Sequence, residues 1–146
     1  MQIVDAHRHL WDLSQNFYPW LCNQPRIDFR YGDYREICNS YLPEDYDRDT
    51  ADYTVVGSVH IEAEWDPMDP VGETRWLDAI APKCRHTMVV VAQVRLDGKD
   101  VKSVLRAHAA SPNMRGVRHK PAACPTAHGI KRGGVGSMDD PRWRDG

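Results

Sequence analysis

Two nearly uninterrupted apolar runs constrain the fold of this chain more than any other feature of its sequence. They are YTVVGSVHIEAE at residues 53–64 and TMVVVAQVRL at residues 87–96, and both are rich in β-branched side chains. Runs of this kind are typical of strands that are buried on both faces, as in parallel sheets. The segments between them must then supply helices that cover the sheet, because parallel strands need long crossover connections.

Helical patterns do lie between and around the two runs. Pro43 is followed by two acidic residues, which is typical of the first turn of a helix. Asp100 can cap a helix in which apolar residues recur at helical spacing. The predicted helices cover residues 43–52, residues 71–83 and the segment that starts at Asp100, and two shorter strands are predicted at 3–7 and 114–120. Residues 11–41 show no periodicity, and so long an irregular connection is unusual unless it covers a functional site.

This order of elements predicts an α/β fold with a parallel sheet and right-handed crossovers. Four such units in 146 residues correspond to the N-terminal half of a (β/α)₈ TIM barrel, whose full length is typically about 250 residues. A compact four-stranded α/β sheet is the alternative. Because a half barrel leaves two sheet edges open, we interpret residues 1–146 as one partial barrel domain truncated after strand four. We expect the segment SMDDPRWRDG at 137–146 to end before its helix can form.

Composition and charge argue against several classes of protein. Hydrophobic residues make up 41% of the chain and charged residues 27%, which is typical of a globular domain. The formal net charge is −2 and no basic block is present, so we expect no nucleic-acid partner. The sequence contains neither an apolar run of membrane length nor a secretory signal, so we expect a cytoplasmic protein without membrane contact.

The stretch VDAHRHLW near the N-terminus places two histidines one residue apart at the end of the first predicted strand. Residues i and i+2 of a strand point to the same face, so Asp5, His7 and His9 are expected on one face, and Ala6 and Arg8 on the other. In a barrel, catalytic residues lie at this end of the strands. Two adjacent imidazoles can bind a divalent metal or donate hydrogen bonds to a developing oxyanion, and the alternative is two polar residues that simply end a strand.

The stretch DAHRHLW resembles the first-strand motif of the amidohydrolase superfamily. It is most similar to the amidohydrolase-2 group, which holds L-fuconolactonase-like and 2-pyrone-4,6-dicarboxylate lactonase-like hydrolases. Further stretches share the resemblance: YPWL at 18–21, VHIEAEWDPMDPVGETRWL at 59–77, MRGVRH at 114–119 and DDPRWRDG at 139–146. The resemblance covers essentially the whole chain but only the N-terminal half of the family fold. It implies a hydrolase, most specifically a lactonase that opens a sugar lactone or related cyclic ester.

The resemblance also implies roles for three candidate catalytic residues. His7 and His9 match the paired histidines, which bind zinc or another divalent metal in some relatives and contact the substrate carbonyl without a metal in the lactonase branch. The implied cofactor is therefore a divalent metal such as zinc or manganese, or none. Arg118 matches a strand-four arginine that binds a carboxylate or carbonyl oxygen, for which the planar guanidinium is suited, and an ordinary ion pair is the alternative.

The end of the second predicted strand and two tryptophans supply candidate substrate-binding residues. His60, Glu62 and Glu64 alternate onto one face, where they can bind sugar hydroxyls or pair with Arg or Lys of neighbouring elements. Of these we favour His60 and Glu62 for substrate binding. Trp11 and Trp20 are candidates for a pocket wall because sugar faces stack on aromatic rings, with core packing as the alternative.

The resemblance places further site histidines on strands five and six, and the general-base aspartate on strand eight. Without that aspartate the attacking water lacks its main proton acceptor, so we expect the chain alone to be inactive and the activity to belong to an intact protein. Two other hypotheses remain open. One is a metal-dependent decarboxylase or amidohydrolase of the same superfamily. The other is a non-catalytic half barrel that acts by association, since open sheet edges favour self-association.

Overall fold

The structure is a computed structural model that describes residues 1–26, 32–121 and 137–145. Its sheet has four parallel strands in the order β1-β2-β3-β4. The strands are β1 (Gln2–Arg8), β2 (Thr54–Ile61), β3 (Thr87–Gln93) and β4 (Met114–Arg118). Helices lie between successive strands, so the predicted α/β architecture of half a TIM barrel is confirmed.

The helices are α1 (Pro19–Cys22), α2 (Pro43–Asp49), α3 (Gly72–Ile80), α4 (Val101–Ala109) and α5 (Pro141–Asp145), with 3₁₀ turns η1 (Arg35–Ile37) and η2 (Ala81–Lys83). Three of them, α2, α3 and α4, lie at the predicted positions, with α2 and α3 shorter than predicted, and the short helix α1 lies in the segment predicted to be irregular. The expectation that no helix forms near the C-terminus is wrong. Asp140 accepts a hydrogen bond from the backbone N–H of Arg142 at 3.0 Å and so caps α5, whose first residue is Pro141. No described helix combines the length and apolar character needed to cross a membrane.

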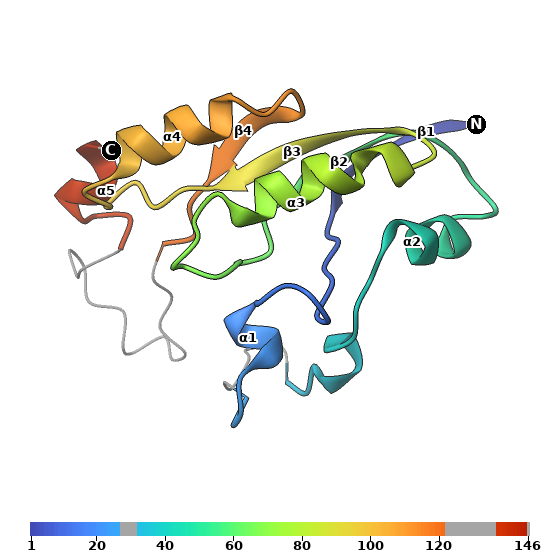
Figure 1. Cartoon of the computed structure of the whole chain (residues 1–146), viewed down its shortest axis with the longest axis horizontal. Coiled ribbons are helices and arrows are strands. Elements are labelled where there is room, and N and C mark those ends of the chain that lie inside the picture. The colour runs from blue at the N-terminus through green and yellow to red at the C-terminus, as the bar shows by residue number, and fades with distance from the viewer. Residues whose placement is uncertain (27–31, 122–136, 146) are drawn as a thin grey trace.

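The segment between β1 and α2 is irregular over most of its described length, as predicted. Figure 1 shows the chain leaving the sheet after β1, passing through α1 and returning to the sheet through α2. An antiparallel bridge between Trp11 and Tyr41 joins the two ends of this excursion, with N–O distances of 3.0 and 2.8 Å. The excursion is therefore anchored where it leaves and rejoins the sheet.

The hydrophobic core lies between the sheet and helices α2 and α3. Met88 and Val90 of β3 share a buried cluster with Leu77 and Ile80 of α3 and with Tyr46 of α2. In Figure 1, α3 runs alongside β2 and β3. The helices on this face hold in place the sheet whose carboxyl edge carries a group of polar side chains.

The opposite face of the sheet is more open. Val59 pairs with Val89 and Ile61 with Val91, in alternation with the core-facing residues, and these four side chains are only partly buried. Val4 of the edge strand β1 is 63% exposed. In a closed barrel this face is the packed interior, so its exposure is what half a barrel presents.

The end of β1 carries an irregularity that alters which side chains share a face. Asp5 and Arg8 are three residues apart but pair with β2 residues only two apart. Asp5 Oδ2 accepts a hydrogen bond from the Tyr46 hydroxyl at 2.9 Å, and the Arg8 guanidinium lies 4.5 Å from the centre of the same ring. The predicted grouping of Asp5 with His7 and His9 is therefore wrong, because the extra residue of a bulge shifts the alternation.

Candidate functional site

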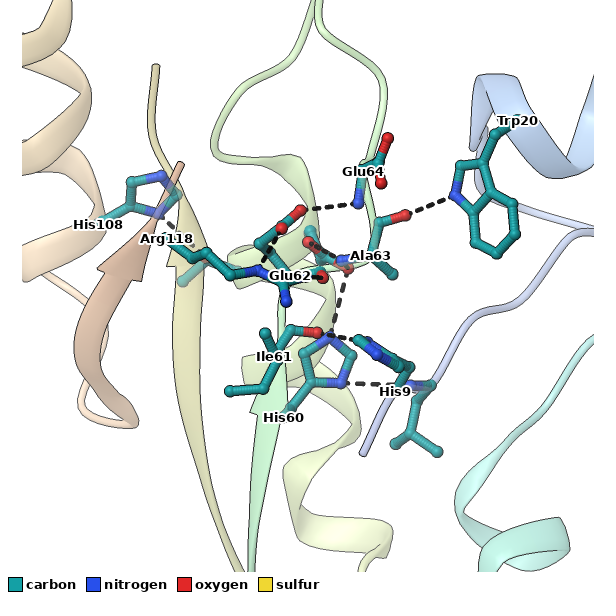
Figure 2. A network of polar contacts seen from close by, with 12 residues as sticks. His9, Trp20, His60, Ile61, Glu62, Ala63, Glu64, His108 and Arg118 are labelled. Carbon is teal, nitrogen blue, oxygen red and sulfur yellow. Dashed lines mark hydrogen bonds and ion pairs between the residues drawn. The ribbon is translucent and has the colours of Figure 1, made fainter. Parts of the chain in front are cut away.

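The side chains of His9 and Arg118 meet the carboxyl end of β2 from opposite sides. His9 follows β1 and contacts the carbonyl oxygen of Ile61 at 2.7 Å, and Arg118 ends β4 and contacts the carbonyl oxygen of Glu62 at 2.8 Å. Figure 2 shows the two side chains on either side of this strand end. The carboxyl edge of the sheet thus gathers polar groups from β1, β2 and β4, as barrel active sites do.

The protonation of His9 follows from its hydrogen bond. A carbonyl oxygen only accepts, so Nδ1 of His9 carries the proton that it donates to Ile61, and Nε2 of the neutral ring keeps its lone pair. Burial is the main reason that the pKa of His9 falls to about 4, and the nearby charge of Arg118 acts in the same direction. His9 is therefore neutral at physiological pH, with an Nε2 that can bind a metal or accept a proton but cannot donate a hydrogen bond.

His7 lies directly beside His9. The two ring centroids are 5.1 Å apart in an edge-to-face arrangement. His7 is exposed, whereas His9 is half-buried. The two histidines of the motif are thus neighbours, and His7 is the more accessible to solvent.

Two tryptophans extend the site from His9. Trp11 stacks on His9 with centroids 6.2 Å apart, and Trp20 meets Trp11 edge-to-face at 6.0 Å. Both are tied down by their indole N–H groups, Trp11 to the carbonyl of Asn39 at 2.6 Å and Trp20 to that of Ala63 at 2.8 Å. Both also pack against a small buried cluster, so they have a structural role whether or not they contact a substrate.

Arg118 forms an ion pair with a buried carboxylate. Its Nε lies 2.7 Å from Oε1 of Glu62, whose side chain is 1% exposed. The second oxygen of Glu62 accepts the backbone N–H of Glu64 at 2.9 Å. The buried charge of Glu62 is satisfied by Arg118 and the backbone, so the ion-pair alternative is the one observed, and substrate binding by Glu62 stays a prediction.

His60 is also enclosed by the protein. Its Nδ1 accepts the backbone N–H of Leu10 at 3.2 Å, and its Nε2 lies 3.3 Å from Oε1 of Glu73. Burial lowers the pKa of the fully buried His60 to about 3. Both ring nitrogens of His60 are thus engaged inside the fold, and substrate contact by His60 stays a prediction.

Sequence reasoning missed Glu73. An acidic residue in the first turn of a predicted helix is ordinarily explained by the helix dipole. The structure instead buries its carboxylate, which accepts the backbone N–H of Ala63 at 3.0 Å, and burial raises the pKa of Glu73 to about 8. The motif stretch at 59–77 contains both His60 and Glu73, but nothing in its spacing shows that the two side chains meet.

Glu64 forms a second ion pair across the end of the sheet. Its backbone has a φ of 61°, in the left-handed region that non-glycine residues rarely adopt. Its carboxylate pairs with Lys120, which follows β4, and both side chains are about half exposed. The alternative in which these carboxylates pair with Arg or Lys is therefore the one observed for Glu62 and Glu64, with partners from β4 and the residues after it.

The described residues offer only part of a metal site. Across residues 1–26, 32–121 and 137–145, no three His, Cys, Asp or Glu side chains are grouped so as to hold a metal ion. His7 and His9 supply two imidazoles, whereas catalytic zinc sites use three protein ligands.

Comparison with known proteins identifies a family and a relative of this chain. The family described as Amidohydrolase matches residues 4–129. The Uncharacterized protein y4mH of Sinorhizobium fredii (strain NBRC 101917 / NGR234) is 38% identical over 116 residues, which cover 80% of this chain and 39% of that protein. This chain thus spans about two fifths of the length of that curated relative. No solved structure matches the chain significantly.

Proposed function

Because this chain belongs to the amidohydrolase family, we propose that it supplies the first four strands of a hydrolase that opens a sugar lactone or a related cyclic ester. One observation carries the proposal. His9 and Arg118 bind the consecutive carbonyl oxygens of Ile61 and Glu62 at the carboxyl edge of the parallel sheet. Family membership supports a hydrolase, and the lactone is our proposal for its substrate.

In this proposal Arg118 binds the carbonyl oxygen of the substrate. Its bonds to Glu62 through Nε and Nη2 fix the plane of the guanidinium, which leaves Nη1 as a donor. A donor held in advance stabilises the negative charge that develops on the carbonyl oxygen during attack by water. Trp11 and Trp20 then offer ring faces to the sugar, and the paired Glu62 orients Arg118 and does not act as a base.

A divalent metal fits the chemistry of the histidine pair. Metal-ligating histidines ordinarily donate their second ring N–H to a carbonyl or carboxylate, as His9 does to Ile61. His7 and His9 would hold the ion, together with ligands from outside the described residues. When bound, zinc or manganese supplies a Lewis acid that polarises a carbonyl and lowers the pKa of water.

A metal-dependent amidohydrolase or decarboxylase of the same superfamily is the second candidate. The tautomer of His9 favours it, because Nε2 carries a lone pair and no proton. A lactonase that works without a metal needs an N–H donor at the substrate carbonyl, which His9 does not supply. In a metal-free lactonase that task would fall to Arg118 and the exposed His7.

The test is a full-length chimera in which this chain replaces the matching region of the Sinorhizobium fredii relative. We expect the chimera to open at least one member of an aldonolactone panel, measured by acid release. Arg118→Met should lower kcat/KM about 100-fold, as loss of one transition-state contact does. His9→Asn should lower kcat/KM as well, because it removes the imidazole that would hold a metal and that bonds the Ile61 carbonyl. Lys102→Met, at an exposed position on α4, is the control and should have no effect.

Chelation separates the two candidates. Activity on lactones that survives EDTA supports the metal-free lactonase. Activity that is lost with EDTA and restored by zinc or manganese supports a metal-dependent enzyme. A folded, metal-loaded chimera that opens no lactone contradicts the proposed substrate class.

A further inference from the structure

We propose that Glu73 and His60 are positioning residues that hold His9 in its observed orientation and tautomer. This role rests on the proposed function of His9. Both side chains are buried within the described part of the chain and lie behind the site. Their contacts link the end of β1, the end of β2 and the first turn of α3.

The backbone pairing of β1 with β2 ends just before His9. The last residue pair of the β1–β2 ladder is Arg8 with His60. Beyond it, the backbone N–H of Leu10 donates to Nδ1 of His60 at 3.2 Å. The side chain of His9 donates to the carbonyl of Ile61 at 2.7 Å. The hydrogen bonds Leu10–His60 and His9–Ile61 thus keep the chain after β1 beside the end of β2, where backbone pairing has stopped.

The contacts of His60 determine which of its ring nitrogens carries the proton. A backbone N–H only donates, so Nδ1 of His60 must be unprotonated to accept from Leu10. The proton of the neutral ring is then on Nε2, which donates to Oε1 of Glu73 at 3.3 Å. Glu73 therefore favours the one tautomer of His60 that can hold Leu10, the residue next to His9.

Glu73 also contacts the end of β2, which carries the carbonyl group bonded to His9. Its Oε1 accepts the backbone N–H of Ala63 at 3.0 Å, two residues after the Ile61 carbonyl to which His9 is bonded. One buried carboxylate thus acts on both sides of the His9–Ile61 hydrogen bond. It reaches the β1 side through His60 and Leu10 and the β2 side through Ala63. Figure 2 shows His60 and Ala63 close to His9 and Ile61.

The contacts of Glu73 satisfy two buried donors that an apolar side chain could not satisfy. An apolar side chain at position 73 would fill the same interior, but it would leave the Ala63 N–H and the His60 Nε2–H without acceptors. Each buried donor left without an acceptor destabilises the folded state. A fully satisfied buried network of this kind specifies one local arrangement, which is what an imidazole that must present Nε2 requires.

The experiment is ¹⁵N NMR of the histidine rings in the 146-residue chain, because ring-nitrogen shifts report the tautomer directly. In the wild type we expect His9 to be protonated at Nδ1 and His60 at Nε2. Glu73→Met should convert His9 from this single tautomer to an averaged pair of shifts. Glu73→Gln, whose amide oxygen can still accept from His60 and Ala63, should restore the wild-type pattern.

Thr74→Val is the matched control. Thr74 is the next residue of α3, is equally buried and also hydrogen-bonds a histidine, but that histidine is His108, on the β3 side. The variant loses a buried hydrogen bond and should leave the His9 shifts unchanged. If Glu73→Met does not fold, Glu73→Asp serves in its place, since its shorter side chain keeps the carboxyl group but withdraws it from His60 and Ala63.

A folded Glu73→Met or Glu73→Asp chain with an unchanged His9 tautomer overturns the proposal, as does the same change at His9 in Thr74→Val. The readout does not depend on catalysis. If the chimera hydrolyses nothing while the His9 tautomer still responds to Glu73, the proposed function fails and the positioning role stands. If the chimera is active and the tautomer does not respond, the positioning role fails alone.

Discussion

The buried carboxylate of Glu62 is neutralised by the guanidinium of Arg118. The side chain of Glu62 is 1% exposed, and Nε of Arg118 lies 2.7 Å from its Oε1. Arg118→Met leaves that charge buried without its partner, so we predict that the free energy of unfolding falls by about 3 kcal/mol, measured by urea denaturation. The double variant with Glu62→Leu should recover most of the loss, because no buried charge remains. Equal stability of Arg118→Met and the wild type would show that the ion pair is not formed.

Helices α3 and α4 and strand β3 are joined through one histidine. The Thr74 hydroxyl donates to Nδ1 of His108 at 2.9 Å, and Nε2 of His108 donates to the carbonyl of Gln93 at 3.0 Å. Burial lowers the pKa of His108 below its ordinary value of 6.5. The unfolded chain then binds a proton at this ring more readily than the folded chain, so stability should fall as pH drops below about 6.5. His108→Gln should flatten this part of the profile of denaturation midpoint against pH, and an unchanged slope would rule out His108 as its source.

Among the described residues, the sheet has two open edges, at β1 and β4, and one apolar face that is only partly covered. Val4 on the edge strand β1 is 63% exposed, and the row of valines on β2 and β3 is half-buried. Unpaired strand edges with apolar side chains favour association between chains. We predict concentration-dependent self-association of the chain in sedimentation experiments, reduced by Val4→Lys. Met68→Lys, at an 87% exposed position outside the sheet, is the control, and a monomer at all concentrations would contradict the prediction.

The fold could be predicted from the sequence because its signals are local. The apolar runs at 53–64 and 87–96 contain β2 and β3, and the capping pattern at Asp100 locates α4. The bulge in β1 was missed because its cause lies in the register with β2, which no pattern within residues 3–7 contains. α5 was missed for a different reason: Asp140 followed by Pro141 is a local helix-start signal, and a helix of five residues forms in the short segment that follows.

The candidate site could be predicted only in part. The sequence showed that His7 and His9 lie together, since residues two apart in an extended segment are close in space. It did not show that His60 and Glu62 are enclosed. Their partners are Leu10, 50 residues from His60, and Arg118, 56 residues from Glu62. Polar residues at a strand end look the same in sequence whether they face a substrate or pair with one another.

The sequence by itself determined that this chain forms a parallel sheet with helices between its strands, and that a histidine pair ends the first strand. Periodicity and capping act over a few residues, so they can be read from the chain directly. Only the tertiary structure decided that Nε2 of His9 keeps its lone pair, that Arg118 is held by Glu62, and that Glu73 lies behind both strand ends. These depend on which distant groups satisfy each buried donor and charge, and that choice is made when the elements pack together.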